Sequence, residues 1–219
     1  MKNRGSQTHQ NGENSKKQKI YNMIILDESG SMESIKSNIV SGFNEVIQSI
    51  SGIEKQFPEQ KHFISFITFN GLGIKTHLEN QPVNKIKEID EKIYNPDSIT
   101  PLYDAIGFSV SKLKLFLSTK KRFNVYVTIL TDGLENASKE YSSKQVKKLI
   151  ENLKMDNWTF NYIGTDHDIT KAANSISINS TMFFDKNQKS MQGMFAAERS
   201  ARFAFCKVIN EINEDKSVE

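Results

Sequence analysis

The stretch IILDESGSM occupies residues 24–32. Its three apolar residues predict a buried strand, and a helical spacing of apolar residues follows shortly after. Asp27, Ser29 and Ser31 therefore lie on a strand-to-helix loop, where ligands bind in open α/β sheets. Their oxygens suit a hard divalent cation. The alternative interpretation is that Asp27 or Ser31 only caps the next helix.

The rest of the chain alternates strands with helices. We expect strands near residues 19–26, 62–69, 74–78, 125–130, 158–163 and 181–184. We expect helices near residues 35–52, 101–117, 142–153, 166–173 and 189–212. Asn70-Gly71 is a strong hairpin signal and predicts that the third strand returns along an edge. The fold class is α/β: a doubly wound, Rossmann-like three-layer sandwich with a mostly parallel six-stranded sheet and one antiparallel edge strand.

Three details of the helices are also predicted. Gly52 is expected to end the first helix. Thr100 is expected to cap the second, with Pro101 as its first helical residue. The last helix is expected to bury one apolar stripe, comprising Met194, Ala201, Phe205, Val208 and Ile212, widened by Phe195, Cys206 and Ile209.

Length and composition predict one domain, over residues 19–213, between a disordered basic leader, 1–18, and a flexible C-terminus, 214–219. The formal net charge is +3, but residues 1–19 carry +4 and the remainder carries −1, so a folded nucleic-acid surface is not indicated. No apolar stretch approaches the roughly 20 residues that span a bilayer, so no membrane contact is expected. A single cysteine and a polar N-terminus predict a cytoplasmic protein.

Two further oxygen donors fall at the same predicted edge of the sheet. Thr100 begins a helix, and Asp132 directly follows the apolar strand near residues 125–130. Singly, Thr100 is explained as a helix cap and Asp132 as part of a turn. Together with the residues of the first loop they predict a metal site.

The order of these motifs resembles that of von Willebrand factor type A (vWA) domains. Asp-x-Ser-x-Ser after the first strand, Thr-Pro-Leu opening a helix and Thr-Asp-Gly ending a strand match the metal-ion-dependent adhesion site of that family. The resemblance covers roughly residues 20–212 and looks closest to stand-alone intracellular members from bacteria and phages. It implies five metal ligands: Asp27, Ser29, Ser31, Thr100 and Asp132.

The resemblance also implies a function. A divalent cation, Mg²⁺ first and Mn²⁺ or Ca²⁺ as alternatives, is expected to bind a protein partner through an Asp or Glu of that partner. Glu28, Asn70 and Glu135 are candidate partner contacts, the two glutamates as surface charges and Asn70 as a residue that reaches the same crevice. A zinc site at His167 and Asp168 is not expected, because the four histidines are scattered.

Two other functions remain open from the sequence. The first is metal-dependent phosphoryl transfer or hydrolysis with Asp27 as the acceptor. This chemistry usually needs a second carboxylate two residues later, where this chain has Ser29, and no lysine is evident at a matching strand end, so we do not expect an enzyme. The second is a nucleic-acid-associated module that uses the basic leader.

Overall fold

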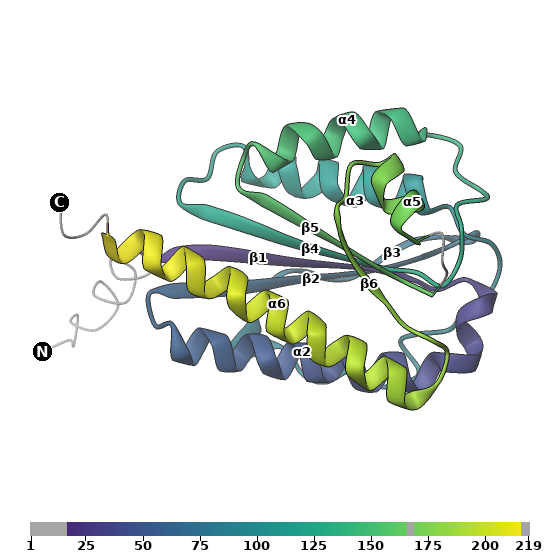
Figure 1. Cartoon of the computed structure of the whole chain (residues 1–219), viewed down its shortest axis with the longest axis horizontal. Coiled ribbons are helices and arrows are strands. Elements are labelled where there is room, and N and C mark those ends of the chain that lie inside the picture. The colour runs from purple at the N-terminus through teal and green to yellow at the C-terminus, as the bar shows by residue number, and fades with distance from the viewer. Residues whose placement is uncertain (1–16, 166–168, 216–219) are drawn as a thin grey trace, which may run out of the picture.

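A six-stranded sheet forms the centre of the computed structural model, which describes residues 17–165 and 169–215 (Figure 1). The strands lie in the order β3-β2-β1-β4-β5-β6. Their bounds are Gln18–Asp27 (β1), Gln60–Asn70 (β2), Gly73–Pro82 (β3), Phe123–Leu130 (β4), Trp158–Gly164 (β5) and Ser180–Phe183 (β6). All neighbouring pairs are parallel except the hairpin of β2 and β3. The predicted α/β fold with one antiparallel edge strand is confirmed.

Helices cover both faces of this sheet (Figure 1). Their bounds are Gly30–Ile35 (η1, a 3-10 helix), Lys36–Gln56 (α2), Val83–Lys85 (η2, a 3-10 helix), Leu102–Leu117 (α3), Ser143–Lys154 (α4), Ile169–Ser175 (α5) and Gln188–Asp215 (α6). α3, α4 and α5 lie on one face, and α2 and α6 lie on the other (Figure 1). Among the described residues, none of the helices is both long and apolar enough to cross a bilayer.

Alternation along β1 explains why two cores form. Tyr21, Met23 and Ile25 pack with α3 and α4, whereas Ile24 and Leu26 pack with α2 and α6. Successive side chains of a strand point to opposite faces, so a strand that is apolar throughout must be covered on both sides. This places β1 and β4 at the centre of the sheet.

Two predicted helix boundaries are wrong. α2 continues through Gly52 to Gln56, because Ile53 is buried against Ile20 and Phe57 in a small third core. The N-cap of α3 is Pro101, not Thr100, and no side chain caps this helix. Thr100 is therefore not explained by a capping role.

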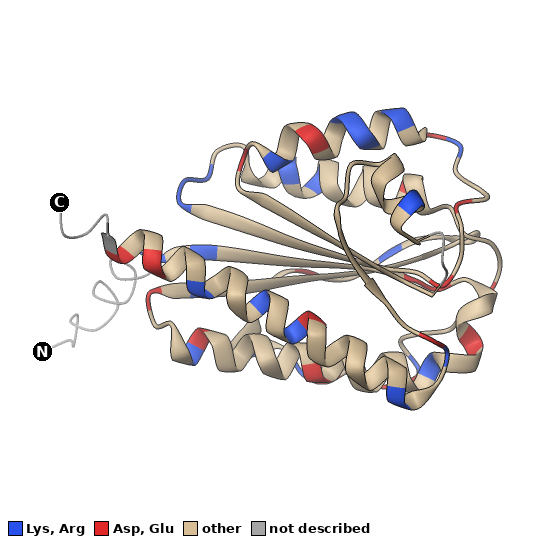
Figure 2. Ribbon diagram, viewed as in Figure 1, with Lys and Arg blue, Asp and Glu red and all other residues tan. Residues whose placement is uncertain are grey.

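The buried face of α6 also differs from the predicted stripe. Val208 and Ile212 are about half exposed, whereas Glu198 and Arg202 are fully buried. Arg202 pairs with Glu198, donates hydrogen bonds to Asn22 Oδ1 (2.6 Å) and Thr128 Oγ1 (2.9 Å), and lies over the ring of Tyr126. These hydrogen bonds offset part of the cost of burying the ion pair, although Glu198 Oε2 and Arg202 Nε have no hydrogen-bond partner among the described residues. The remaining charges of α6 include acidic and basic residues interspersed along the helix (Figure 2).

Candidate metal centre

All five predicted ligands lie at the carboxyl edge of the sheet. Asp27 ends β1, Ser29 directly precedes η1, and Ser31 is the second residue of η1. Asp132 follows β4, and Thr100 precedes α3. β1 and β4 are neighbours in register, so the loops after them meet, and acidic segments of the ribbon come together there (Figure 2).

The hydroxyl and carboxylate oxygens are in contact across these loops. Ser31 Oγ donates a hydrogen bond of 2.6 Å to Asp132 Oδ1, and it lies 3.2 Å from Ser29 Oγ. A β-carbon placed on Gly133 would lie 3.6 Å from Thr100 Oγ1 and 4.0 Å from Ser31 Oγ, so the threonine belongs to the same cluster. Four of the predicted ligands are thereby brought together.

Asp27 lies behind this cluster and orients it. Its Oδ1 accepts a hydrogen bond of 2.7 Å from the backbone N–H of Ser29, and its Oδ2 accepts one of 2.5 Å from the Thr131 hydroxyl. The side chain is fully buried. Burial raises the pKa of Asp27 to about 6, although the hydrogen bonds from Thr131 and Ser29 act in the opposite direction; the charge of Asp132 raises it further.

Asp132 has one satisfied and one unsatisfied oxygen. Its side chain is buried, and Oδ2 accepts no hydrogen bond of good geometry from the residues that the structure describes. Nζ of Lys186 lies 2.5 Å from this oxygen and forms an ion pair with it. The same ammonium group donates a hydrogen bond of 3.0 Å to the backbone oxygen of Ser31. An incompletely satisfied buried carboxylate is an expected feature of a cation site.

The donor set fits a hard divalent cation. It consists of carboxylate and hydroxyl oxygens, which are the ligands that Mg²⁺ prefers, and it contains no nitrogen or sulfur. Within residues 17–165 and 169–215, no group of three or more His, Cys, Asp or Glu side chains is placed to hold a metal. Of the predicted non-ligands, His167 and Asp168 lie outside the described residues.

The helix-cap interpretation of the first loop is wrong. No side-chain cap is present at η1 or at α2, which begins only at Lys36. Asp27 instead hydrogen-bonds the N–H two residues ahead, and Ser31 contacts Asp132.

Two of the three candidate partner contacts are buried structural residues. Glu28 is fully buried; its Oε1 accepts a hydrogen bond of 2.6 Å from the N–H of Asn95, and its Oε2 lies 3.3 Å from Nζ of Lys75. Asn70 is also buried and joins the backbone of Glu28 to that of Leu72. The expectation that Glu28 is a surface charge is therefore wrong, and the Asn70 amide is used within the fold.

Glu135 is already engaged as well. Its two carboxylate oxygens accept hydrogen bonds from the N–H groups of Tyr103, Ala137 and Ser138 and from the Ser138 hydroxyl, all between 2.7 and 2.8 Å. The residue fastens the loop after Asp132 to the start of α3. It is partly exposed but does not act as a free surface charge.

Three residues near the cluster were not singled out from the sequence. Thr131 orients Asp27, and the hydroxyl of the buried Tyr94 donates a hydrogen bond of 2.6 Å to the backbone oxygen of Asp27. Lys186 reaches the site from the β6–α6 loop. Thr131 could have been found from the Thr-Asp-Gly motif, but Tyr94 and Lys186 lie on irregular segments with no motif of their own.

A large cavity among the described residues lies away from this site. A cavity of about 1000 Å³ lies at the opposite end of the sheet, where Gln18, Phe123 and Ile209 are among the residues that line it. A metal ion that contacts one partner side chain does not need a cavity of that size, so geometry and donor chemistry identify the site better than volume does.

Solved structures share this fold at low sequence identity. The PilB minor pilin from Streptococcus sanguinis matches with a TM-score of 0.60 and 13% identity, covering 85% of this chain and 62% of the pilin. The pilus adhesin SpaC from Lactobacillus rhamnosus GG matches with a TM-score of 0.62 and 12% identity, covering 85% of this chain and 30% of the adhesin. The SpRpn10 VWA domain matches with a TM-score of 0.55 and 10% identity, covering 80% of this chain and 92% of that domain.

The chain thus spans less than two thirds of the pilin and of the adhesin, and these likenesses concern the fold alone. No curated protein matches the sequence. A model of the von Willebrand factor type A domain family, however, matches residues 23–197, which include every residue of the candidate metal centre. The chain belongs to the von Willebrand factor type A domain family.

Proposed function

We propose that this chain is a metal-dependent interaction module. Asp27, Ser29, Ser31, Thr100 and Asp132 hold a divalent cation, most readily Mg²⁺, and an Asp or Glu of a partner protein completes the shell of the ion. The observation that carries the proposal is the convergence of Ser29, Ser31, Thr100 and Asp132 at one point of the sheet edge, although their loops are far apart in the chain.

The charges of these residues favour an anionic partner. The three hydroxyl ligands carry no formal charge, so Asp27 and Asp132 together balance one divalent ion. Asp27 is held by Ser29 and Thr131 behind the hydroxyl groups, which suits a contact to the ion through water. An ion with few anionic ligands remains electrophilic, and a partner carboxylate is the ligand that it lacks.

The comparisons support a protein partner. Two of the similar structures are a pilus adhesin and a minor pilin, and a third is a VWA domain of SpRpn10. We further infer that this module acts in the cytoplasm like the stand-alone bacterial and phage members that its motifs resemble. The lone and buried Cys206 is compatible with a reducing compartment.

Phosphoryl transfer is the less favoured alternative. A lysine does reach the site, contrary to the expectation from sequence, but Lys186 contacts Asp132 and not Asp27. Asp27 is fully buried with both oxygens hydrogen-bonded, which is a poor arrangement for a nucleophile. Ser29 stands where the general acid would be. Hydrolysis of a generic aryl phosphate by the purified protein, lost in Asp27→Asn, would favour this alternative.

Calorimetric titration with Mg²⁺ and Mn²⁺ tests the proposal. We expect one site in the wild-type protein and at least tenfold weaker binding in Asp132→Asn, because a buried carboxylate ligand loses its charge. Asp156→Asn is the matched control, since Asp156 is exposed and precedes β5 at the other end of the sheet. Equal titrations of the wild type and Asp132→Asn would contradict the assignment.

A second experiment tests the acidic partner. The immobilised protein is exposed to its partner in Mg²⁺ and then in EDTA. We expect retention only with Mg²⁺, and loss of retention in Asp27→Ala even with Mg²⁺ present. Undiminished retention in EDTA would reject a metal-bridged contact.

A further inference from the structure

Among the described residues, Lys186 is the cation that pairs with the buried carboxylate of Asp132. Its Nζ lies 2.5 Å from Oδ2, and it also donates a hydrogen bond to the backbone oxygen of Ser31. Both contacts are to residues of the proposed metal centre. The lysine side chain is 37% exposed, whereas the Asp132 side chain is fully buried, so the ammonium group reaches the site from its solvent side.

The backbone around Lys186 is fixed on both sides. Phe184 is fully buried, and its N–H donates to the backbone oxygen of Gly164. Asn187 accepts a hydrogen bond of 2.9 Å from the N–H of Ser190 in the first turn of α6. The backbone of Lys186 is therefore held in place beside the site. Only its flexible side chain has to move for the ammonium group to leave Asp132.

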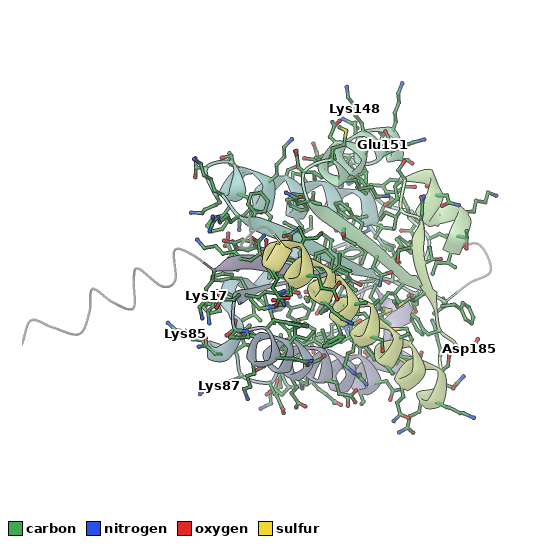
Figure 3. All side chains as sticks on the ribbon, turned by 60° about the vertical axis from the view of Figure 1, so that its left-hand side comes forward. Lys17, Lys85, Lys87, Lys148, Glu151 and Asp185 are labelled. Carbon is green, nitrogen blue, oxygen red and sulfur yellow. The ribbon has the colours of Figure 1, made fainter. Side chains whose placement is uncertain are left out.

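The loop that carries Lys186 lies at the same end of the sheet as the proposed metal centre. The β6–α6 loop runs beside η1, which contains Ser31 (Figure 1). Asp185, the neighbour of Lys186, lies at the opposite end of the molecule from Lys17, where β1 begins (Figure 3). Among the described residues, Asp132 forms its ion pair with Lys186.

We propose that Lys186 is a tethered cation that competes with the divalent ion for Asp132 and so sets the metal affinity of the site. This inference rests on the proposed function. An ammonium group and a metal ion cannot both approach Oδ2 of Asp132 closely, because they repel each other and need the same lone pairs. Lys186 has three rotatable donors on a flexible stem and turns into solvent when the ion binds.

The competition has a structural logic. A buried carboxylate without a counter-ion is strongly destabilising, and Lys186 supplies that counter-ion when no metal is bound. The ion must therefore displace a charge that is already paired. A partner carboxylate at the site gives the ion another ligand and gives the released ammonium group a new counter-ion, which links metal binding to partner binding.

Lys186→Met tests the inference, because methionine keeps the length of the side chain without its charge. We expect Mg²⁺ to bind the variant about tenfold more tightly than the wild type in calorimetric titration. Lys189→Met is the matched control: Lys189 is exposed in the first turn of α6, and its replacement is expected to change the affinity less than about twofold.

Thermal unfolding gives an independent readout. In EDTA, Lys186→Met is expected to melt below the wild type, because Asp132 loses its counter-ion, and saturating Mg²⁺ is expected to raise its Tm by more than that of the wild type. Equal or weaker Mg²⁺ binding by Lys186→Met, with one site retained in the wild type, would overturn the role of Lys186 alone. Absence of any Mg²⁺ or Mn²⁺ site in both proteins would overturn the metal centre and this inference with it.

Discussion

Ser31 and Asp132, 101 positions apart in the chain, are joined by a hydrogen bond of 2.6 Å from Oγ to Oδ1. The contact connects the loop after β1 to the loop after β4, and it exists because these two strands are neighbours at the centre of a parallel sheet. Parallel strands end at the same edge, so their following loops form the place where ligands bind. The topology thus assembles a set of oxygen donors that no single loop contains.

Thr100→Val is expected to weaken Mg²⁺ binding about tenfold, because valine keeps the shape of threonine but removes one hydroxyl ligand. Stability is expected to change little, since Thr100 does not cap α3. Calorimetric titration and thermal unfolding measure the two effects. Thr76→Val on the exposed edge strand β3 is the control. A large loss of stability with unchanged Mg²⁺ affinity would show that Thr100 is structural.

Ser31→Asp is expected to separate metal binding from partner binding. A third carboxylate increases the affinity for the cation, but it neutralises the charge that attracts the acidic residue of the partner. Mg²⁺ titration should therefore give tighter binding, while retention of the partner in Mg²⁺ should fall. If both affinities rise together, the ion does not act as a bridge to a partner carboxylate.

Glu28→Gln is expected to lower the free energy of unfolding by about 1–3 kcal/mol, because Glu28 is a buried acceptor for Asn95 N–H and a partner of Lys75. Urea denaturation measures the change. Glu33→Gln, at an exposed position in η1, is the matched control and should be close to neutral. Unchanged stability combined with loss of partner retention would restore Glu28 as a partner contact.

Arg202→Met is expected to destabilise the protein by about 3–5 kcal/mol, because it leaves the buried Glu198 without its counter-ion. The double variant Arg202→Met/Glu198→Leu should recover a large part of that loss, as measured by a double-mutant cycle in urea. Arg199→Met removes a partly exposed ion pair with Glu45 and should cost less than about 1 kcal/mol. If the double variant is no more stable than Arg202→Met, the loss of stability does not come from the unpaired charge of Glu198.

The buried His62 is expected to make the free energy of unfolding fall at acid pH. Burial, with the nearby charges of Arg202 and Lys61, lowers the pKa of His62 from 6.5 to about 3. Its neutral form therefore contributes full stability above pH 6.5, and this contribution is lost as the pH falls toward 3, because only the unfolded chain takes up the proton. The loss at pH 5 is roughly 2 kcal/mol.

The measurement is urea denaturation of the wild type and of His62→Gln at pH 7 and pH 5. Glutamine has no proton to take up, so the difference in stability between the two proteins should shrink or reverse at pH 5. A difference that stays constant over this range would contradict a neutral, buried His62. Comparison at each pH removes the contribution of other titrating groups, including Asp27.

The spacing of apolar residues in the sequence is sufficient to predict the order of the strands and helices. The apolar runs of β1 and β4 and the spacing of Ile35, Ile39 and Phe43 report burial directly, and short connections restrict the topology to few choices. The helix that we expect near residues 142–153 begins as predicted, with Ser142 as its N-cap in a capping box with Gln145.

Local signals failed where a distant contact decides the outcome. Gly52 does not end α2, because the burial of Ile53 against another element outweighs the low helix propensity of glycine. Glu198 and Arg202 are charged but fully buried, because they pair with each other and hydrogen-bond polar residues of two strands, which are contacts that helical periodicity does not reveal. Lys186 reaches the site from a loop 54 residues beyond Asp132, and nothing in its sequence neighbourhood indicates that.

The location of the ion is the central claim, and Mn²⁺ soaked into crystals of the wild-type protein tests it most directly. An anomalous difference map is predicted to show one strong peak in contact with Ser29, Ser31 and Asp132, close to Thr100, with the Lys186 ammonium group turned away from Asp132. No peak at this edge of the sheet under saturating Mn²⁺, with Lys186 still paired to Asp132, would contradict the account.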